Sequence, residues 1–435
     1  MTEHPALNFK PPPPVSWIVR TLEAEGFETW AVGGSVRDVL AGRSSGDWDF
    51  TTRARPHDIM RIFRRTVPIG VDHGTVGVLA RDGTLYEVTT FRRDVQTDGR
   101  HAQVVFSDTL EEDLSRRDFT INAMAWHPLS GELRDPFGGG QDLEEGRLRT
   151  VGDPAERFRE DYLRVLRALR FAGDFNFQIE EQSWGALQES VPFLPQLSPE
   201  RIREELLKSL SLKAAPRVLE LYRTSGVLRV LYPEVDEGNW METVKVVGHL
   251  PPFRSQLRLA GFLSRIPPLP RAGGGTDPGM PRLLSVLERL RLSNVLIKGT
   301  ATVADGVRRP PLGEDPSMLR LWLSRVGVER VNDTLRVAGA LARALEEEGI
   351  EGAMEVHLRR LRGLRSQLRT NPPLTQADLA LDGKDLMRMG LKPGPQFGRI
   401  LESALHAVLE VPELNKKETL EALVRELWFD SGEST

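Results

Sequence analysis

The sequence contains no cysteine, which excludes disulfides, zinc–thiolate sites and thiol catalysis. It also has no run of about 18 apolar residues, so no transmembrane helix is expected. The first residues include Pro11 to Pro14 and no apolar signal core, and we therefore expect a cytoplasmic protein. The formal net charge is only −4, so a nucleic-acid partner requires a local basic patch rather than a global attraction.

The length and the pattern of the chain indicate several domains. At 435 residues it is too long for one typical core. Strand and helix patterns alternate up to about residue 150, with strands expected near 30–34, 48–51, 75–80 and 85–91. Strand signals almost vanish after that point and helical periodicity continues to the end. The sequence therefore predicts an α+β front part followed by all-α domains.

One segment combines a glycine pair with two closely spaced carboxylates. Gly33 and Gly34 allow a backbone to approach a phosphate closely, and Arg37 can clamp one. Asp47 and Asp49 lie two residues apart on an extended segment, so they point to the same face. Two such charges favour a cation between them, and Mg²⁺ prefers carboxylate and phosphate oxygens. Either feature alone is usually a turn or a solvated pair, but together they indicate nucleotidyl transfer.

Glu87 is a candidate third carboxylate because it interrupts an apolar strand pattern. Carboxylate clusters are common in sites that hold two metal ions. The alternative for Glu87 is a salt bridge on the sheet surface.

A second cluster lies at residues 114–123. If this segment is helical, Arg117, Asp118 and Asn122 lie within about one turn of each other. They can then bind a triphosphate and a ribose hydroxyl together. The alternative is a surface ion pair of little energetic value.

The third cluster places Asp161, Arg164, Arg167 and Arg170 three residues apart, on one slowly drifting helix face. A solvated arginine face is the plain alternative. Cytosine and adenine, however, both present an amino donor beside a ring-nitrogen acceptor, so a fixed Asp161 can accept and a fixed Arg164 can donate. Uracil and guanine present the reverse order and leave buried groups unpaired.

These motifs carry a family resemblance. In order, residues 33–38 with Asp47 and Asp49, residues 116–123, 135–139 and 160–164 strongly resemble the ordered motifs of class II tRNA nucleotidyltransferases, the CCA-adding enzymes. Residues 381–386 and 390–395 resemble the tail domain of that family. The resemblance covers most of the chain and is weakest in the Pro/Gly-rich stretch between Pro251 and Pro281, which we expect to be a flexible surface loop.

The resemblance implies four domains. A polymerase-beta-like catalytic head with a small mixed sheet occupies residues 1–150, and a helical neck with the base-reading helix occupies 151–215. A helical body spans 216–370, and a helical, tRNA-binding tail spans 371–435.

The resemblance also implies the reaction and its residues. The 3′-hydroxyl of tRNA attacks the α-phosphate of CTP or ATP and releases pyrophosphate, with two Mg²⁺ ions expected per active site and no membrane or protein partner implied. Asp47 and Asp49 hold the metals, with Glu87 as a further catalytic carboxylate. Asp118 and Asn122 belong to a ribose-sensing motif, and Asp161 with Arg164 forms the base template. The full nucleotide-binding set is Gly33, Gly34, Arg37, Arg117, Asp118, Asn122, Asp161, Arg164, Arg167 and Arg170.

Basic residues near the tail are the candidates for tRNA contacts. An arginine-rich helix with interleaved leucines is most often a solvated face, but its position just before the tail favours phosphate binding. The candidates are Arg359, Arg360, Arg362, Arg365, Lys384 and Lys392.

Several alternatives remain open at this point. The Asp98–His101 segment matches the core of the family's switching loop and favours full CCA addition over A-only or CC-only activity. A bacterial poly(A) polymerase is less favoured because residues 68–75 lack the basic, Phe-containing stretch of those enzymes. A non-catalytic RNA-binding protein is also less favoured, since the acidic and basic motif residues are all intact.

Overall fold

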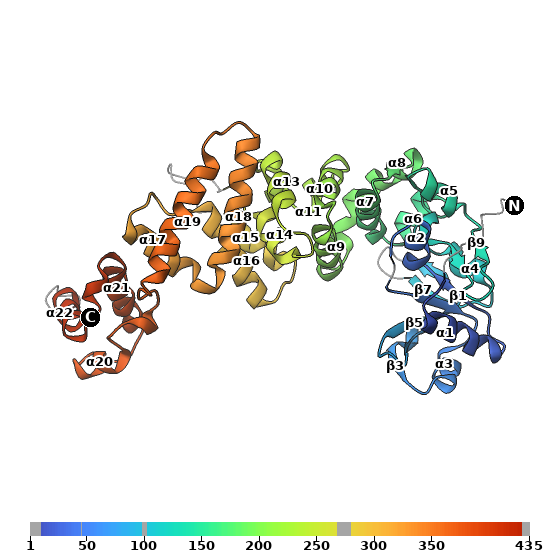
Figure 1. The fold of residues 1–435 in the computed structure, drawn as a ribbon, viewed down its shortest axis with the longest axis horizontal. Helices are drawn as coiled ribbons and strands as arrows, with labels where there is room; N and C mark the ends of the chain where they lie inside the picture. Colours follow the sequence, from blue (N-terminus) through green and yellow to red (C-terminus); the bar gives the residue numbers. More distant parts are fainter. Residues whose placement is uncertain (1–9, 45, 98–101, 268–279, 429–435) are drawn as a thin grey trace. The chain divides into compact units, whose positions relative to one another are not determined.

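The structure is a computed structural model that describes residues 10–44, 46–97, 102–267 and 280–428. Its contacts divide the chain into two compact units. The first comprises Met1–Ser209 with Arg217–Leu231, and the second comprises Leu210–Pro216 with Tyr232–Thr435. Figure 1 shows the sheet confined to the N-terminal unit and helices throughout the remainder. None of the described helices is long and apolar enough to cross a membrane.

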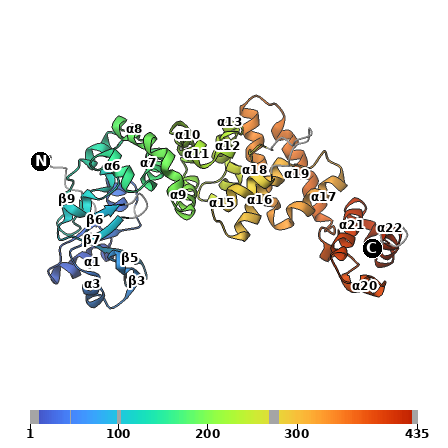
Figure 2. The same ribbon diagram turned by 180° about the vertical axis from the view of Figure 1, so that it is seen from behind.

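A seven-stranded mixed sheet forms the base of the first unit, as predicted. β2 and β5 run parallel, and all other neighbours in this sheet are antiparallel. Figure 2 shows the unit from the opposite side. In spatial order the strands are β3 (Thr66–Gly70), β4 (Thr75–Leu79), β5 (Leu85–Thr90), β2 (Asp49–Thr52), β1 (Thr29–Val32), β8 (Ala125–Trp126) and β9 (Leu133–Arg134).

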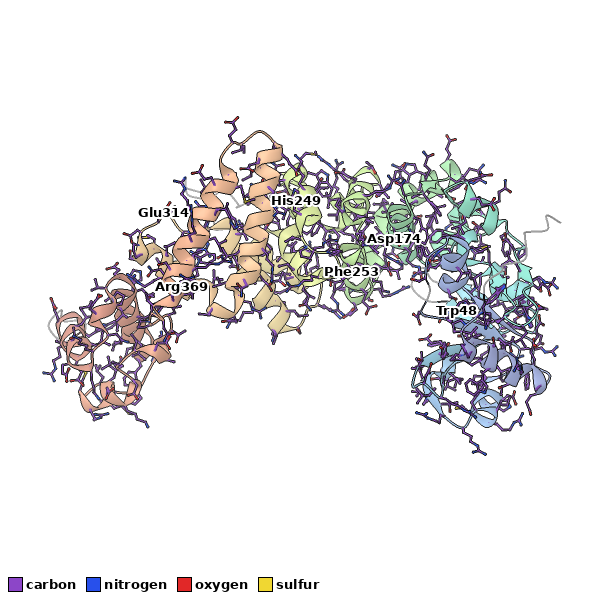
Figure 3. The ribbon with its side chains drawn as sticks, viewed as in Figure 1. Trp48, Asp174, His249, Phe253, Glu314 and Arg369 are labelled. Atoms are coloured by element: carbon purple, nitrogen blue, oxygen red, sulfur yellow. The ribbon has the colours of Figure 1, made fainter. Side chains whose placement is uncertain are left out.

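Helices α1 (Pro13–Ala24) and α3 (Pro56–Ile62) pack on this sheet, and α2 (Gly34–Leu40) follows β1 directly. The apolar face of α1 (Val15, Ile18, Val19 and Leu22) is fully buried, as the helical spacing of these residues requires. Trp48, labelled in Figure 3, lies in the same core and packs on Trp126 at 5.8 Å between ring centroids. This core holds β2 and β5 in place, the two strands that carry Asp49 and Glu87.

Two antiparallel strands that form a separate sheet follow β5 in the chain. β6 (Arg92–Thr97) pairs with β7 (Ala102–Phe106) in an antiparallel arrangement. The Asp98–His101 segment, on which the prediction of full CCA addition depends, lies outside the described residues.

The rest of the first unit is mainly helical. Its one further sheet in the described part of the unit is a two-residue parallel pair, β10 (Arg147–Leu148) with β11 (Gln178–Ile179). The other elements are α4 (Leu110–Ser115), η2 (Thr120–Asn122), α5 (Gly139–Glu144), α6 (Pro154–Glu160), α7 (Leu163–Phe175), α8 (Glu181–Ser190), η3 (Val191–Gln196), α9 (Pro199–Ser211), α10 (Ala215–Thr224) and α11 (Val227–Leu231).

The second unit is helical in all its described elements. They are α12 (Pro233–Asp236), α13 (Trp240–His249), α14 (Ser255–Leu263), α15 (Met280–Arg289), α16 (Asn294–Arg308), α17 (Pro316–Val326), α18 (Val328–Glu347), α19 (Ala353–Arg369), η4 (Gln376–Asp378), α20 (Gly383–Arg388), α21 (Gln396–Glu410), η5 (Pro412–Leu414) and α22 (Lys417–Trp428). The predicted all-α character of this part of the chain is confirmed.

The prediction of a surface loop between Pro251 and Pro281 was wrong over the first part of this stretch. Residues Ser255–Leu263 form α14, whose residues Leu257 to Leu263 are all buried. The apolar residues Leu257, Leu259, Phe262 and Leu263 supply a core face that the flanking prolines and glycines obscure. Residues 268–279 of this stretch lie outside the described part of the chain.

Candidate active site

Two carboxylates lie side by side on two central strands of the sheet. Asp49 on β2 and Glu87 on β5 are direct register partners in a parallel pair, so their side chains point to the same face. Asp47 lies just before β2 and is exposed. Burial raises the pKa of Asp49 to about 6, and the negative charges of Asp47 and Glu87 contribute to this rise, whereas Arg117 opposes it. The alternative interpretation of Glu87 as a surface ion-pair partner has no such pair among the described residues.

The three carboxylates suit a divalent cation chemically. The described residues contain no group of three or more His, Cys, Asp or Glu side chains arranged to hold a metal ion. Asp49 nevertheless experiences repulsion from two neighbouring carboxylates, and a bound cation relieves it. Oxygen donors of this type are those that Mg²⁺ prefers.

The glycine turn lies beside these carboxylates. Gly33 has φ +76°, and a Cβ on it would lie 3.2 Å from Nη1 of Arg117 and 3.9 Å from Oδ2 of Asp49. Glycine is therefore needed here both for the left-handed backbone and for the close approach of Arg117. Arg37 on α2 donates to Oδ1 of Asn122 at 2.6 Å and to Oδ1 of Asp38 at 2.8 Å.

Asp113 organises the adjacent arginine pair, and the sequence reasoning did not identify it. This fully buried carboxylate on α4 accepts hydrogen bonds from Arg116 at 3.1 Å and from Arg117 at 3.3 Å. It also accepts one from the Thr51 hydroxyl of β2 at 3.2 Å. Burial opposes its ionisation, but Arg117 and Arg116 hold its pKa below the usual value. The four-residue spacing from Asp113 to Arg117 was the available signal, although α4 itself ends at Ser115.

Asp118 and Asn122 form an internal network rather than a free pair. Asp118 lies between α4 and η2, so the segment is not one continuous helix, and the condition under which these residues share one helical turn is not met. Its Oδ1 accepts from the Phe119 backbone and from Asn122, each at 2.9 Å, and its Oδ2 accepts from Arg167 at 2.7 Å. Although burial disfavours the charge, Arg167 and these hydrogen bonds lower the pKa of Asp118 to about 2.

Asp161 also differs from its predicted setting. It lies in an extended break between α6 and α7, with φ −155°, and does not share a helix face with the three arginines of α7. Its Oδ1 accepts from the backbone N–H of Leu163 at 3.1 Å, so it begins the new helix as a cap does. Its Oδ2 accepts from Arg201 of α9 at 2.7 Å, a partner that sequence spacing does not reveal.

The three arginines of α7 differ in their main hydrogen-bond partners, although Arg167 also lies 3.9 Å from Glu205. Arg164 donates to Glu160 at 2.6 Å and to the carbonyl of Arg116 at 3.3 Å. Arg167 joins Asp118, as described above, whereas Arg170 donates to the buried carboxylate of Glu205 at 2.7 Å. Arg170 is therefore held against α9.

A cavity of about 480 Å³ extends from the carboxylates Asp49 and Glu87 to the start of α7. Its size suits a small-molecule ligand. Of the predicted residues, neither Asp47 nor Arg170 is among those that line it in the described part of the chain. The predicted residues that do are Gly33, Gly34, Arg37, Asp49, Glu87, Arg117, Asp118, Asn122, Asp161, Arg164 and Arg167.

The tRNA-binding candidates all belong to the second unit. Arg359, Arg362 and Arg365 are exposed on α19, whereas Arg360 is half-buried. Leu364 is buried on the opposite side, but Leu358 is 46% exposed, so the apolar face is shorter than the leucine spacing suggests. Lys384 on α20 and Lys392 after it are exposed.

Three family models match successive parts of the chain. They are described as the poly A polymerase head domain (residues 29–149), the probable RNA and SrmB-binding site of polymerase A (176–238) and the putative tRNA nucleotidyltransferase domain 2 (282–424). The CCA-adding enzyme of Geobacillus kaustophilus is 34% identical over 94% of this chain and 95% of its own length. That of Levilactobacillus brevis is 35% identical over 94% and 96% of the two chains.

The chain belongs to the CCA-adding enzyme family. As a member it is a tRNA nucleotidyltransferase. The solved CCA-adding enzyme of Bacillus stearothermophilus in complex with CTP is similar over 98% of this chain and all of its own, with a TM-score of 0.70 and 30% identity. The Thermotoga maritima enzyme complexed with tRNA shares the fold with a TM-score of 0.60 at 22% identity, over 97% and 98% of the two chains. The predicted family and fold class are confirmed.

Proposed function

We propose that this CCA-adding enzyme adds C, C and A in turn to the 3′ end of tRNA, using CTP and ATP without a nucleic-acid template. The observation that carries the proposal is that Asp49, Glu87, Asp161 and Arg164 line one cavity together. In the proposal, two carboxylates for phosphoryl chemistry (Asp49 and Glu87) and the Asp161/Arg164 pair for base selection therefore face the same bound nucleotide. Relatives named CCA-adding enzymes and a related structure in complex with CTP support the same substrates.

In the proposed reaction, the terminal 3′-oxygen of tRNA forms a bond to the α-phosphorus of the nucleotide. The bond from that phosphorus to the bridging oxygen breaks, pyrophosphate leaves, and the hydroxyl proton passes to a carboxylate or to solvent. The positive charges of Arg37 and Arg117 hold the phosphates in line, and positioning of this kind supplies much of the rate enhancement in phosphoryl transfer.

We propose Asp47, Asp49 and Glu87 as the residues that hold Mg²⁺, with two ions in the active site. When bound, the metal neutralises charge on the attacking and leaving oxygens. The mutual repulsion of these carboxylates supports this assignment.

Base selection is assigned to Asp161 and Arg164. Both oxygens of Asp161 are already hydrogen-bonded, but an ionised carboxylate has about four lone-pair sites and can still accept from an exocyclic amino group. Arg164 is oriented by Glu160, and a guanidinium carries enough N–H donors to reach a ring nitrogen as well. The wrong base leaves these groups unpaired, at a cost of about 1–3 kcal/mol per group.

The remaining assignments follow the motifs. Gly33 and Gly34 form the turn against the nucleotide, and Arg167 and Arg170 complete the basic side of α7. Asp118 and Asn122 sense the ribose, which requires Asp118 to share or exchange its bond to Arg167. We propose the head, neck, body and tail at 1–150, 151–215, 216–370 and 371–435, with tRNA gripped by the tail and the exposed cations of α19, and a cytoplasmic location.

One assay tests the activity directly. tRNA substrates ending before the first C, after CC and after CCA are incubated with labelled CTP and ATP separately and together, and product lengths are read on a gel. The proposal expects two additions with CTP alone, one A on the CC-ended substrate, and none after CCA.

Other product patterns identify the alternatives. Addition of A alone, or arrest at CC with both nucleotides present, assigns a specialised enzyme, and long adenosine tails assign a poly(A) polymerase. Asp47→Asn is the matched variant: it removes one charge from the carboxylate set, and we expect no product while its circular dichroism spectrum stays unchanged. An active Asp47→Asn enzyme contradicts the metal assignment.

A further inference from the structure

A second cavity, of about 400 Å³, lies within the helices of the C-terminal unit. Helices α16, α18 and α19 form much of it; Figure 1 shows α18 and α19 side by side, and both α16 and α19 pack against α18. All of its lining residues belong to this unit, so it is separate from the nucleotide cavity described above. Its size falls within the range of roughly 300–1,000 Å³ that is typical of small-molecule sites.

Four basic side chains line this cavity, and in the described part of the chain they lack most of the partners that such groups normally have. Arg308 and Arg360 have neither a hydrogen bond nor an ion pair there, and Nη1 of Arg308 is buried. Arg265 is bound to Glu242 through Nη2 at 2.6 Å, but its buried Nε has no partner. His357 completes the set.

Nearby acidic groups neutralise only part of this charge: Glu242 pairs with Arg265, but neither Arg308 nor Arg360 has such a pair in the described part of the chain. Asp305 is the carboxylate that acts on Arg308, and it is already held by both Nε and Nη2 of Arg309, the former at 2.8 Å. Arg309 and Arg265 both repel Arg308. Glu351 is the one acidic residue among those lining the described cavity, and it is exposed to solvent. Partly buried guanidinium groups without a paired counter-ion, such as those of Arg308 and Arg360, are unusual and indicate a site for an anion.

The other walls define what the anion carries. They are mostly aliphatic: Leu335, Leu341, Leu345, Ile350 and Val356. The indole of Trp322 offers no free donor, because its Nε1 donates to the carbonyl of Gly306 at 3.1 Å. The lining therefore provides cations for an acidic head group and apolar surface for a hydrocarbon body. It provides few acceptors for the amino and hydroxyl groups of a nucleotide or a sugar.

We propose that this cavity binds a small amphipathic anion, with a carboxylate or phosphate group on Arg308, Arg360 and Arg265 and an aliphatic body against the leucine walls. The site is a binding site additional to the tRNA and nucleotide sites. An RNA backbone phosphate is less suited to it, because RNA brings no hydrocarbon to cover the aliphatic surface.

Calorimetric titration of the full chain with decanoate tests this proposal. We expect saturable binding of one decanoate per chain. Arg308→Ala and Arg360→Ala each remove one charge-assisted contact and should weaken binding at least tenfold. Arg359→Ala is the matched control: this neighbouring arginine of α19 pairs with Glu314 and Glu355, outside the cavity, so its removal should change the affinity less than twofold.

Two further measurements keep the outcome decisive. Ala338→Leu fills the apolar part while leaving every cation in place, so it should also weaken binding at least tenfold, and thermal unfolding confirms that each variant is folded. Inorganic phosphate, which lacks a hydrocarbon body, should bind at least tenfold more weakly than decanoate. The proposal is overturned if decanoate does not bind, if the two arginine variants bind it like wild type, or if these variants weaken only the binding of tRNA.

Discussion

At the scale of single residues, the site depends on charges that hold other charges in place. Asp113, Asp118, Glu160 and Glu205 each bind at least one arginine near the cavity, at distances of 2.6–3.3 Å. Such buried networks are strong when complete and costly when one partner is removed. The nucleotide-facing arginines therefore owe their orientation to carboxylates that do not themselves line the cavity, with the exception of Asp118.

Asp161→Ala should reduce discrimination against UTP and GTP. The change removes the acceptor for the amino group of C and A, which is worth about 1–3 kcal/mol, or roughly fivefold to 150-fold in selectivity. The measurement is the ratio of kcat/KM for CTP over UTP and for ATP over GTP. Asp174→Ala on α7, whose carboxylate pairs with Arg43 at 3.3 Å, is the control and should leave both ratios unchanged. Unaltered selectivity in Asp161→Ala places the template elsewhere.

Asp113→Asn should raise the KM for CTP and ATP by a similar factor, because Arg116 and Arg117 lose the charge that orients them. We expect an increase of about tenfold with a smaller change in kcat, and a loss of about 1–3 kcal/mol in unfolding free energy. Steady-state kinetics and denaturant titration measure the two effects. Glu111→Gln, an exposed change on the same helix, should do neither. A stability loss with no change in KM reduces Asp113 to a structural role.

At the scale of elements, two short segments decide the geometry. The turn from β1 to α2 brings Gly33 against Arg117, and the break between α6 and α7 turns Asp161 toward the cavity and toward Arg201. The register of β2 and β5 adds Glu87 beside Asp49. At the turn and at the break, the functional residue lies at the end of an element, where the backbone can change direction.

Helix α19 provides the test of tRNA binding. The double variant Arg362→Glu and Arg365→Glu reverses two exposed charges, so phosphates should be repelled and the KM for tRNA should rise at least tenfold. The KM for CTP should stay within twofold. The dependence of tRNA binding on salt should also become less steep, by about one unit of log–log slope for each phosphate that the variant no longer binds.

The matched control for α19 reverses two exposed arginines of the first unit, Arg20→Glu with Arg64→Glu, and gives the same change in net charge. Equal tRNA kinetics in both double variants shows that net charge alone is responsible. Wild-type tRNA kinetics in the α19 variant would show that Arg362 and Arg365 are solvated surface residues that do not bind tRNA.

At the scale of the whole molecule, the ionised carboxylate of Asp49 beside Asp47 and Glu87 should lower the free energy of unfolding at neutral pH. The folded pKa of Asp49 is about 6, above the ordinary value of 3.8, so the folded chain binds more protons than the unfolded chain between these values. Stability from this group therefore rises as pH falls from about 6 toward 3.8. By linkage, keeping Asp49 ionised in this setting costs about 2–3 kcal/mol above pH 6.

Asp49→Asn in EDTA should therefore raise the Tm above that of wild type at pH 7.5, and the difference should shrink as the pH approaches 4. Differential scanning calorimetry at a series of pH values measures this. Adding Mg²⁺ should raise the Tm of wild type but not of the variant. A variant less stable than wild type at pH 7.5 contradicts the destabilising charge.

The sequence by itself determined the chemistry of this protein. Local patterns revealed the glycine turn, the Asp47/Asp49 pair, the Arg117 and Asp161–Arg164 motifs, and the change from an α+β to an all-α chain. These features depend on neighbours within a few residues, and strand and helix periodicity is visible in them directly. The identity of the family follows from their order along the chain.

The tertiary structure alone decided which side chains meet. Arg201 on Asp161, Arg167 on Asp118 and Glu87 beside Asp49 join residues separated by 40 to 49 positions or by a strand crossover. The break before α7, the helix within the expected loop, and the inward position of Arg360 were likewise invisible to local spacing. Pairing, burial and electrostatic repulsion depend on distances in space, and spacing along a chain fixes such distances only within one helix or one strand.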